Sequence, residues 1–189
     1  MTRIIAGFAG SIALTVPGSG TRPTSDRVRE AIFSALDSRD AISGMRVLDL
    51  YSGSGALGLE AASRGAAHVT LVDRSAAASR ENAARVLRQA PAGSRPTIVT
   101  SGQTVQPFLE SAREFWNLVF LDPPYELGEV ELTAALSALV PRLGPAALVV
   151  VERSSRTPEP NWPHGVELDR RKDYGDTALY WLTAGAIPA

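Results

Sequence analysis

From residue 46 onward, short apolar runs alternate with segments whose apolar residues recur at helical spacing. The expected order is strand 46–50, helix 56–64, strand 67–72, helix 75–90, strand 96–100, helix 104–112, strand 116–121, helix 128–140 and strand 146–152. Strands joined by helices of this length predict right-handed crossovers and a parallel sheet covered by helices on both faces. The predicted fold class is therefore doubly wound α/β.

The two ends of the chain depart from this alternation. Segments 166–172 and 178–183 are predicted as strands joined by a short turn, so they must pair antiparallel. We therefore expect a mostly parallel, Rossmann-like seven-stranded sheet whose last strand is reversed.

At the N-terminus, extended segments 3–6 and 12–16 predict a small β-hairpin. Thr24 or Ser25 can then cap a helix with apolar residues at helical spacing, at positions 28, 31, 32, 35 and 36. This predicts one catalytic domain, residues 41–189, with an N-terminal hairpin and helix extension at residues 1–40.

Polar residues follow the first four predicted strands of the alternating region. Asp49 ends the first strand, Asp73 follows the second, Gly102 and Gln103 follow the third, and Asp122 follows the fourth. Open α/β sheets bind ligands at the carboxyl ends of their strands, where the strand order reverses. We expect these loops to converge on one crevice.

The first of these loops contains a formal GxGxxG pattern, beginning at Gly53, with Asp73 twenty residues further on. A dinucleotide site is one interpretation. Asp49 argues against it, because a carboxylate before the glycine turn would repel a pyrophosphate but would suit the ammonium and sulfonium charges of S-adenosylmethionine. Gly53 and Gly55 would let the backbone approach this ligand, and Asp73 would accept its ribose hydroxyls. Singly, each residue also fits a structural role.

The segment Asp122-Pro123-Pro124-Tyr125 follows a run that is predicted as a buried strand. Its prolines lack N–H groups and fix φ, so the turn is stiff and its carbonyls remain available as acceptors. Asp122 and the Pro123 carbonyl together suit a planar amino group. Tyr125 offers a face on which a nucleobase could stack, a contact worth about 1–3 kcal/mol. The alternative is an Asp-Pro turn that only closes the strand.

Composition narrows the function classes. The 189 residues are 44% hydrophobic, with no apolar run long enough to span a membrane and no signal-like start, so we expect a cytoplasmic protein. Cysteine is absent and the two histidines are isolated, which argues against thiolate chemistry and a metal site. A net charge of −1 gives no bulk indication of nucleic-acid binding.

With these motifs in place, the chain resembles class I S-adenosylmethionine-dependent methyltransferases, and more closely the RsmD family of small-subunit ribosomal RNA guanine-N2 methyltransferases. The resemblance covers nearly the whole chain: RIIAG at 3–7, RPTSDRVREAIFSAL at 22–36, VLDLYSGSGALGLEA at 47–61, VD at 72–73, DPPY at 122–125 and YGDTALYWL at 174–182. It implies methyl transfer from S-adenosylmethionine to the exocyclic N2 of a guanine in 16S rRNA, naked or within a partly assembled small subunit, by a monomer without metal.

The resemblance also implies roles for individual residues. The cofactor would be bound by Asp49, Tyr51, Gly53, Gly55, Asp73, Arg74, Gly102 and Gln103. The target base would be held by Asp122, Pro123 and Tyr125, and the RNA by Arg3, Arg22, Thr24 and Arg27. Segment 8–14 lacks the basic residues that family members carry there, so further phosphate contacts would fall on Arg153 and Arg156, and RNA affinity would be modest or depend on a ribosomal protein.

Other functions remain open at this stage. An adenine-N6 DNA methyltransferase can use the same DPPY, although the small size leaves no room for a target-recognition domain. A glutamine-N5 protein methyltransferase is expected to carry Asn in place of Asp122. An NAD-dependent oxidoreductase would explain the glycines but gives Asp49 and DPPY no role. A non-catalytic RNA-binding domain would not need the complete set of site residues.

Overall fold

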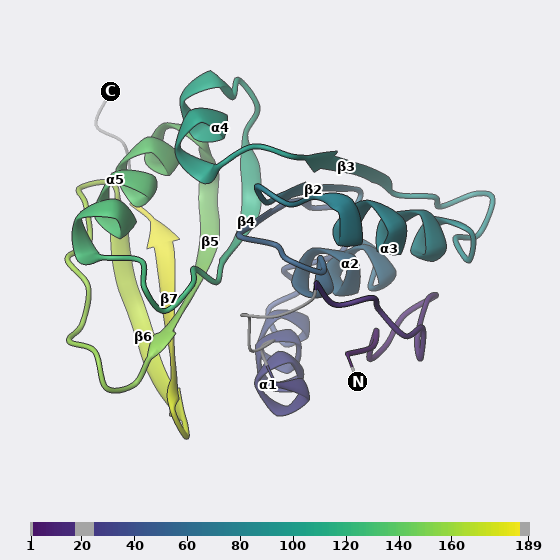
Figure 1. Cartoon of the computed structure of the whole chain (residues 1–189), viewed down its shortest axis with the longest axis horizontal. Coiled ribbons are helices and arrows are strands. Elements are labelled where there is room, and N and C mark those ends of the chain that lie inside the picture. Colours follow the sequence, from purple (N-terminus) through teal and green to yellow (C-terminus); the bar gives the residue numbers. More distant parts are fainter. Residues whose placement is uncertain (1, 18–24, 186–189) are drawn as a thin grey trace.

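The structure is a computed structural model that describes residues 2–17 and 25–185. Its centre is a seven-stranded sheet with helices on both faces (Figure 1). The elements in chain order are α1 (Asp26–Asp37), β1 (Arg46–Leu50), α2 (Ala56–Ser63), β2 (His68–Val72), α3 (Ala77–Leu87), β3 (Thr97–Ser101), α4 (Val105–Ser111), β4 (Trp116–Leu121), α5 (Glu129–Leu139), the 3₁₀ turn η1 (Val140–Arg142), β5 (Leu143–Ser154), β6 (Val166–Tyr174) and β7 (Thr177–Ala184).

The strand order is β3-β2-β1-β4-β5-β7-β6. β7 is antiparallel to both of its neighbours, whereas the other neighbouring pairs are parallel. The predicted fold class, a mostly parallel sheet with a reversed last strand, is thereby confirmed. The chain moves outward from β1 to β3 and then returns to place β4 beside β1, so the strand order reverses between β1 and β4. That is where a doubly wound sheet opens a crevice at the carboxyl ends of its strands.

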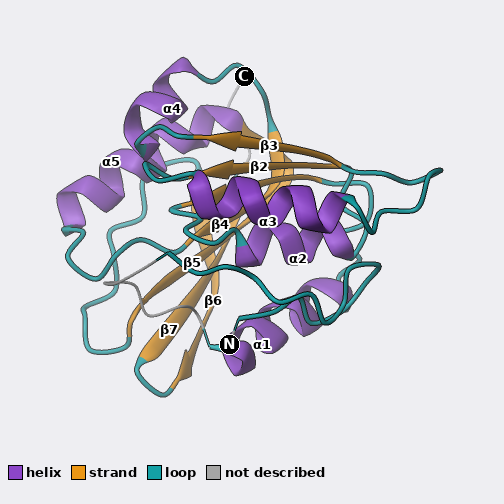
Figure 2. Cartoon of the chain, turned by 45° about the vertical axis from the view of Figure 1, so that its right-hand side comes forward, coloured by secondary structure: helices purple, strands orange, loops and turns teal. Residues whose placement is uncertain are grey.

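Alternate residues of the central strands face two separate cores. On β4, Leu118 and Phe120 join the core with α1, α2 and α3, whereas Val119 and Leu121 join the core with α4 and α5. Figure 2 shows α2 and α3 against one face of the sheet. Burial on both faces explains why these strands are nearly continuous apolar runs. The packing on both faces also fixes where β1 and β4 end.

The N-terminal segment differs from the predicted hairpin. The two segments pair antiparallel only over a short stretch: Arg3 forms a bridge with Ala13, the Ile4 N–H donates to the Ile12 carbonyl at 2.9 Å, and the Leu14 N–H donates to the Thr2 carbonyl at 2.9 Å. The backbone of this segment is also held by α2: the buried Glu60 carboxylate accepts hydrogen bonds from the N–H groups of Ile5 at 2.6 Å and Ala6 at 3.0 Å. Because Glu60 of α2 takes these donors, the pairing between the two segments stays short and the segment packs on this helix.

The remaining differences concern the ends of elements. The fifth strand begins at Leu143 rather than at residue 146, and α3 spans Ala77–Leu87 rather than 75–90. The turn expected at 173–176 shortens to Gly175–Asp176, with Gly175 at φ 62°. A glycine at positive φ is what a two-residue hairpin of this kind requires. Within the described ranges, no helix is long and apolar enough to cross a membrane.

Candidate active site

Three carboxylates gather where β1 and β4 end. Asp49 lies on β1 with its side chain 1% exposed, and its Oδ2 accepts a hydrogen bond from the Gly58 N–H at 2.8 Å. Burial raises the pKa of Asp49 to about 8; the Gly58 hydrogen bond opposes the rise, and the charges of Asp122 and Asp73 add to it. Such mutual influence means that the three predicted carboxylates lie near one another at this edge of the sheet. A cationic ligand there would relieve their repulsion.

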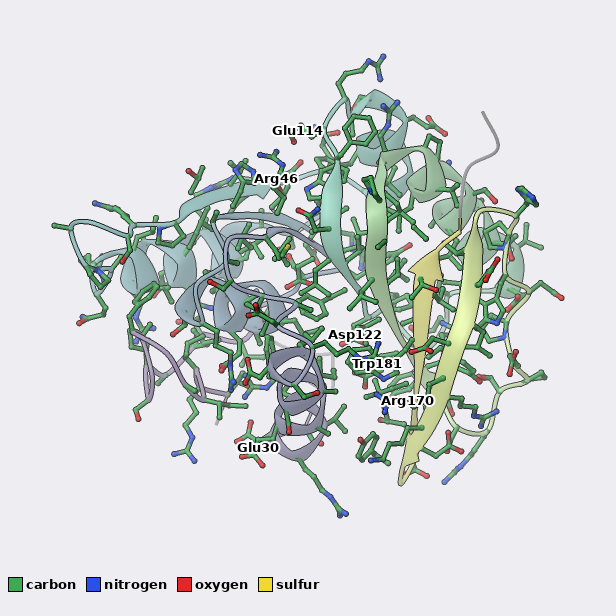
Figure 3. The ribbon with its side chains drawn as sticks, turned by 180° about the vertical axis from the view of Figure 1, so that it is seen from behind. Glu30, Arg46, Glu114, Asp122, Arg170 and Trp181 are labelled. Atoms are coloured by element: carbon green, nitrogen blue, oxygen red, sulfur yellow. The ribbon has the colours of Figure 1, made fainter. Side chains whose placement is uncertain are left out.

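Asp122 lies at the end of β4 opposite to the Arg46–Glu114 ion pair, as Figure 3 shows. The paired residues of β1 and β4 fix this position, since Leu50 pairs with Leu121 in the parallel ladder. Asp122 is therefore one residue past the ladder, at the carboxyl edge. The predicted placement of this residue agrees with the structure.

The glycine loop takes a backbone path that L-residues rarely adopt. Tyr51, Gly53 and Gly55 have φ values of 61°, 51° and 79°. A Cβ at Gly53 would meet no atom within 4 Å, so this glycine leaves its backbone open to a ligand. A Cβ at Gly58 would lie 2.4 Å from Leu71 Cδ2 and 3.1 Å from Asp49 Cβ. Gly58 therefore allows α2 to pack closely enough for its N–H to reach Asp49.

Asp73 links this loop to the end of β2. Its Oδ2 accepts from the Gly53 N–H at 3.0 Å and its Oδ1 from the Ser75 N–H at 2.8 Å. The two bonds fix the carboxylate orientation, and each oxygen retains a lone pair for a further donor. Asp73 is thus arranged as a bidentate acceptor beside the glycine loop, which suits a ribose diol.

Replacing Asp73 by Ala is expected to raise the dissociation constant for S-adenosylmethionine by roughly 100-fold, because two charge-assisted hydrogen bonds to the ribose would be lost. Isothermal titration calorimetry measures this. Asp169→Ala removes an exposed aspartate of β6 and is the matched control. Equal affinity in the Asp73 and Asp169 variants would remove Asp73 from the cofactor site.

The DPPY turn presents its tyrosine to solvent. Asp122 is half-buried, Pro123 is buried and Tyr125 is 58% exposed. Tyr125 borders two cavities, one of about 200 Å³ and one of about 380 Å³. Arg153 lines the larger cavity and donates to the Leu127 carbonyl at 2.8 Å, so it braces the loop after DPPY. The tyrosine ring is accessible to a planar group from outside.

The other predicted residues are placed more loosely. Gly102 and Gln103 follow β3 and are exposed, and a Cβ at Gly102 would lie 3.9 Å from Ala76 of the loop that follows Asp73. Arg74, Arg3 and Arg27 are exposed, on the β2–α3 loop, the N-terminal segment and α1 respectively. Arg22 and Thr24 lie outside the described residues. No structural contact therefore tests the predicted RNA-binding residues.

One structural link to the site was not predicted. Asn82 of α3 is fully buried and donates to the carbonyls of Ser54 at 2.9 Å and Thr15 at 2.8 Å, while its Oδ1 accepts from the Thr15 N–H. It therefore ties the N-terminal segment to the glycine loop. The sequence did contain one indication of this link. Ser79, Asn82 and Val86 share one face of the predicted helix, so the polar Asn82 side chain falls on the face that packs against the core.

Backbone N–H groups orient the Asp49 and Asp73 carboxylates of this site. In the part of the chain that the structure describes, no group of three or more His, Cys, Asp or Glu side chains is placed to hold a metal. The Asp49 carboxylate is already bonded by a backbone N–H, and Asp73 by two. The two carboxylates are thus held in fixed orientations by the backbone around them.

Comparison with known proteins decides the family. The family model described as Conserved hypothetical protein 95 matches residues 2–183, nearly the whole chain. Ribosomal RNA small subunit methyltransferase D of Escherichia coli K12 is 37% identical over 177 residues, which are 93% of this chain and 86% of that protein. The chain belongs to the RsmD family. The resemblance drawn from the motifs is thus confirmed.

Other relatives agree with this membership in the RsmD family. YlbH of Bacillus subtilis, a proposed rRNA methyltransferase, is 30% identical over 94% of this chain and 96% of its own length. The solved structure of Escherichia coli yhhF, a proposed methyltransferase, superposes with a TM-score of 0.80 at 35% identity and covers 98% of both chains. A magnesium protoporphyrin IX methyltransferase from Synechocystis, at 16% identity and a TM-score of 0.65, shares the fold.

Proposed function

We propose that this protein transfers the methyl group of S-adenosylmethionine to the exocyclic N2 of a guanine in small-subunit ribosomal RNA. The observation that carries the proposal is the placement of an acceptor turn, Asp122-Pro123, near the buried Asp49 and the partly buried Asp73, where the strand order reverses. Membership of the RsmD family supports the choice of RNA and of the small subunit.

Several residues would hold the cofactor. Asp49 and the glycine loop would receive the amino acid end, and Asp73 the ribose hydroxyls, with Gly102 and Gln103 beside the adenine and Tyr51 and Arg74 at the loop ends. When bound, S-adenosylmethionine supplies an electrophilic methyl group and leaves as a neutral thioether. A dinucleotide fits less well, because a pyrophosphate would lie against carboxylates.

The acceptor turn would prepare the target amine. The lone pair of guanine N2 is delocalised into the ring, so the amine is a weak nucleophile. Asp122 and the Pro123 carbonyl would accept its two N–H groups and align the lone pair for in-line attack. Once the new N–C bond forms, the nitrogen becomes acidic and loses one proton to Asp122 or to water. The net result is methylated N2 and one released proton.

Tyr125 would stabilise the extruded base by stacking. Unstacking a base costs a few kcal/mol, and an aromatic contact returns about 1–3 kcal/mol. Tyr125→Ala is expected to raise KM for the RNA substrate roughly tenfold and to leave the S-adenosylmethionine affinity unchanged. Steady-state kinetics with Tyr125→Phe, which keeps the ring, is the matched comparison; an equal loss in both variants would contradict a stacking role.

The weak charge of the chain bears on the form in which the RNA substrate is bound. Arg3, Arg22, Thr24 and Arg27 are proposed to contact RNA, and the surrounding charge is weak, with a net charge of −1 for the chain. A partly assembled subunit, which presents a shaped surface and ribosomal proteins, is therefore a better substrate than naked RNA. We propose that the enzyme acts as a monomer, without a metal, in the cytoplasm.

Transfer of a tritiated methyl group to small subunits, naked 16S rRNA and DNA tests the proposed substrate. Incorporation into small subunits or their RNA supports the proposal. Incorporation into DNA alone would favour an adenine-N6 DNA methyltransferase, which can use the same DPPY turn. Binding of NADH in place of S-adenosylmethionine, measured by calorimetry, would overturn the reaction class.

A further inference from the structure

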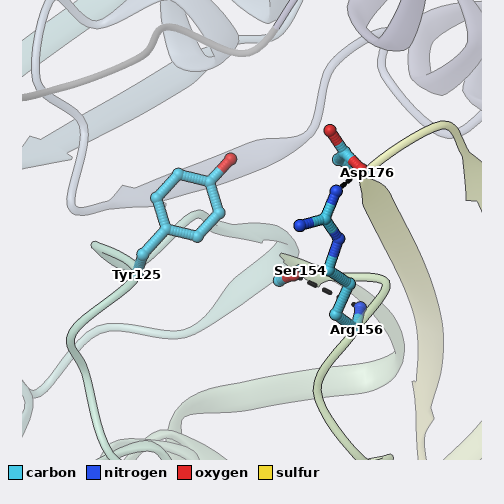
Figure 4. Close-up of a pocket in the computed structure, with 4 residues that line it drawn as sticks. All are labelled: Tyr125, Ser154, Arg156 and Asp176. Carbon is cyan, nitrogen blue, oxygen red and sulfur yellow. Dashed lines mark hydrogen bonds and ion pairs between the residues drawn. The ribbon is translucent and has the colours of Figure 1, made fainter.

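The smaller cavity beside Tyr125 has a distinctive lining. Its four lining residues are Tyr125, Ser154, Arg156 and Asp176, and the tyrosine ring lies opposite the Arg156 guanidinium (Figure 4). Its volume of about 200 Å³ lies below the range of about 300–1,000 Å³ that is usual for drug-sized ligands. The cavity therefore has room for one planar group, such as a base, rather than for a whole nucleotide.

Arg156 is positioned although its side chain is 80% exposed. Its Nη2 donates to Asp176 Oδ1 at 2.9 Å, and its backbone N–H donates to Ser154 Oγ at 3.3 Å. The turn that carries it is joined to the β6–β7 turn, because Ser155 donates to the carbonyls of Asp176 at 2.9 Å and Gly175 at 3.0 Å. The two turns therefore hold the arginine and the aspartate side by side.

The Arg156–Asp176 pair suits a base better than a phosphate. The pair carries no net charge, and the Asp176 carboxylate would repel a phosphate that approached the same guanidinium. The ion pair uses Nη2, which leaves the guanidinium with further N–H donors in a planar fork. The neutral acceptors O6 and N7 of guanine match such a fork, and Arg is the residue that most often reads them.

We propose that Arg156 selects guanine as the target base by donating to its O6 and N7 while the ring stacks on Tyr125 and N2 faces Asp122. Asp176 acts as a positioning residue that orients the guanidinium. The inference rests on the proposed function and deepens it, because it names the groups that distinguish guanine. Adenine carries an amino group where guanine has O6, so it would set donors against the donors of Arg156.

The test uses small subunits reconstituted with rRNA in which 2-aminopurine replaces the guanosine that the wild-type enzyme methylates. This base keeps the N2 amine and lacks O6. For the full-length wild type, kcat/KM for guanosine should exceed that for 2-aminopurine by roughly 10- to 100-fold. Arg156→Lys keeps the positive charge but not the fork, so it should lose most of this preference through slower transfer to guanosine alone.

Two variants complete the design. Asp176→Ala should lower the same preference in part, because the guanidinium loses its orientation. Arg95→Ala removes an exposed arginine ahead of β3 and should keep the wild-type preference. Unchanged affinity for S-adenosylmethionine in all variants shows that the fold is intact.

One result would overturn the inference while leaving the proposed function in place: a wild-type preference in Arg156→Lys, either with unchanged rates or with equal slowing on both bases, as a phosphate contact would give. Failure of the wild type to methylate guanosine N2 would overturn the proposed function itself. The wild-type measurement on guanosine therefore distinguishes the two failures.

Discussion

Asp122→Ala is expected to abolish methyl transfer while the affinity for S-adenosylmethionine stays within about threefold of the wild-type value. The proposed role of Asp122 is to accept an N–H of the target amine, and misplacing a reacting group costs about 100-fold or more in rate. Single-turnover transfer to small subunits measures the chemical step, and calorimetry measures the affinity. Unimpaired transfer by Asp122→Ala would remove this residue from the catalytic site.

Two controls sharpen the result for Asp122. Its negative charge helps to raise the pKa of Asp49, so its removal also alters the cofactor pocket. Affinities should therefore be compared at pH 9, where Asp49 is mostly ionised in both proteins. Asp122→Asn keeps a hydrogen-bond acceptor but cannot take up a proton, so it is expected to retain more activity than Asp122→Ala. Equal loss in both variants would assign the main effect to the carboxylate charge.

The affinity of the wild type for S-adenosylmethionine is expected to rise with pH up to about 8. Burial raises the pKa of Asp49 to about 8, so below that pH the free protein holds a neutral carboxylic acid that must lose a proton to pair with a cation. The expected gain approaches tenfold per pH unit between about pH 6 and 7.5. Calorimetry in buffers with different ionisation enthalpies should detect about one released proton.

Asp49→Asn is the matched control for this pH dependence. It should bind S-adenosylmethionine weakly, with no gain in affinity between about pH 6 and 7.5. The α-amino group of the ligand itself titrates near pH 8, so the difference between the two proteins isolates Asp49. A wild-type affinity that does not change over this range would contradict the placement of the ligand cation at Asp49.

The Asp49 carboxyl group also makes the stability of the ligand-free protein depend on pH. The pKa of Asp49 is 3.8 without its surroundings and about 8 in the fold, so its contribution to stability is fully present below about pH 3.8 and is lost as pH rises through about 8. Asp49→Asn cannot ionise and avoids this loss. The thermal unfolding temperature of Asp49→Asn, measured relative to that of the wild type, should therefore increase as pH rises from about 5 to 9.

The sequence was informative wherever local pattern and topology agree. Each central strand is buried on both faces, so its apolar run was visible, and its end located Asp49, Asp73 and Asp122. Because parallel strands end at one edge, the proximity of the three aspartates followed from these positions without any coordinates. The side-chain roles assigned to these residues remain predictions.

Contacts between segments that are far apart in the sequence could not be predicted from local patterns. The N-terminal hairpin is shorter than predicted because Ile5 and Ala6 bond to Glu60, more than fifty residues away, and no local pattern reports such a partner. The phosphate contact expected for Arg156 stays a prediction. Its ion pair with Asp176, which the antiparallel pairing of β5 with β7 brings about, was not predicted. That pairing changes the charge that Arg156 presents.

The most direct test of the central claim is the identity of the nucleoside that the enzyme makes. Unmodified small subunits should be incubated with the wild-type protein and S-adenosylmethionine, and the rRNA should then be digested and analysed by mass spectrometry. The account predicts N2-methylguanosine at a single site, and none with Asp122→Ala. Formation of N6-methyladenosine, or of no methylated nucleoside on subunits or naked rRNA, would contradict it.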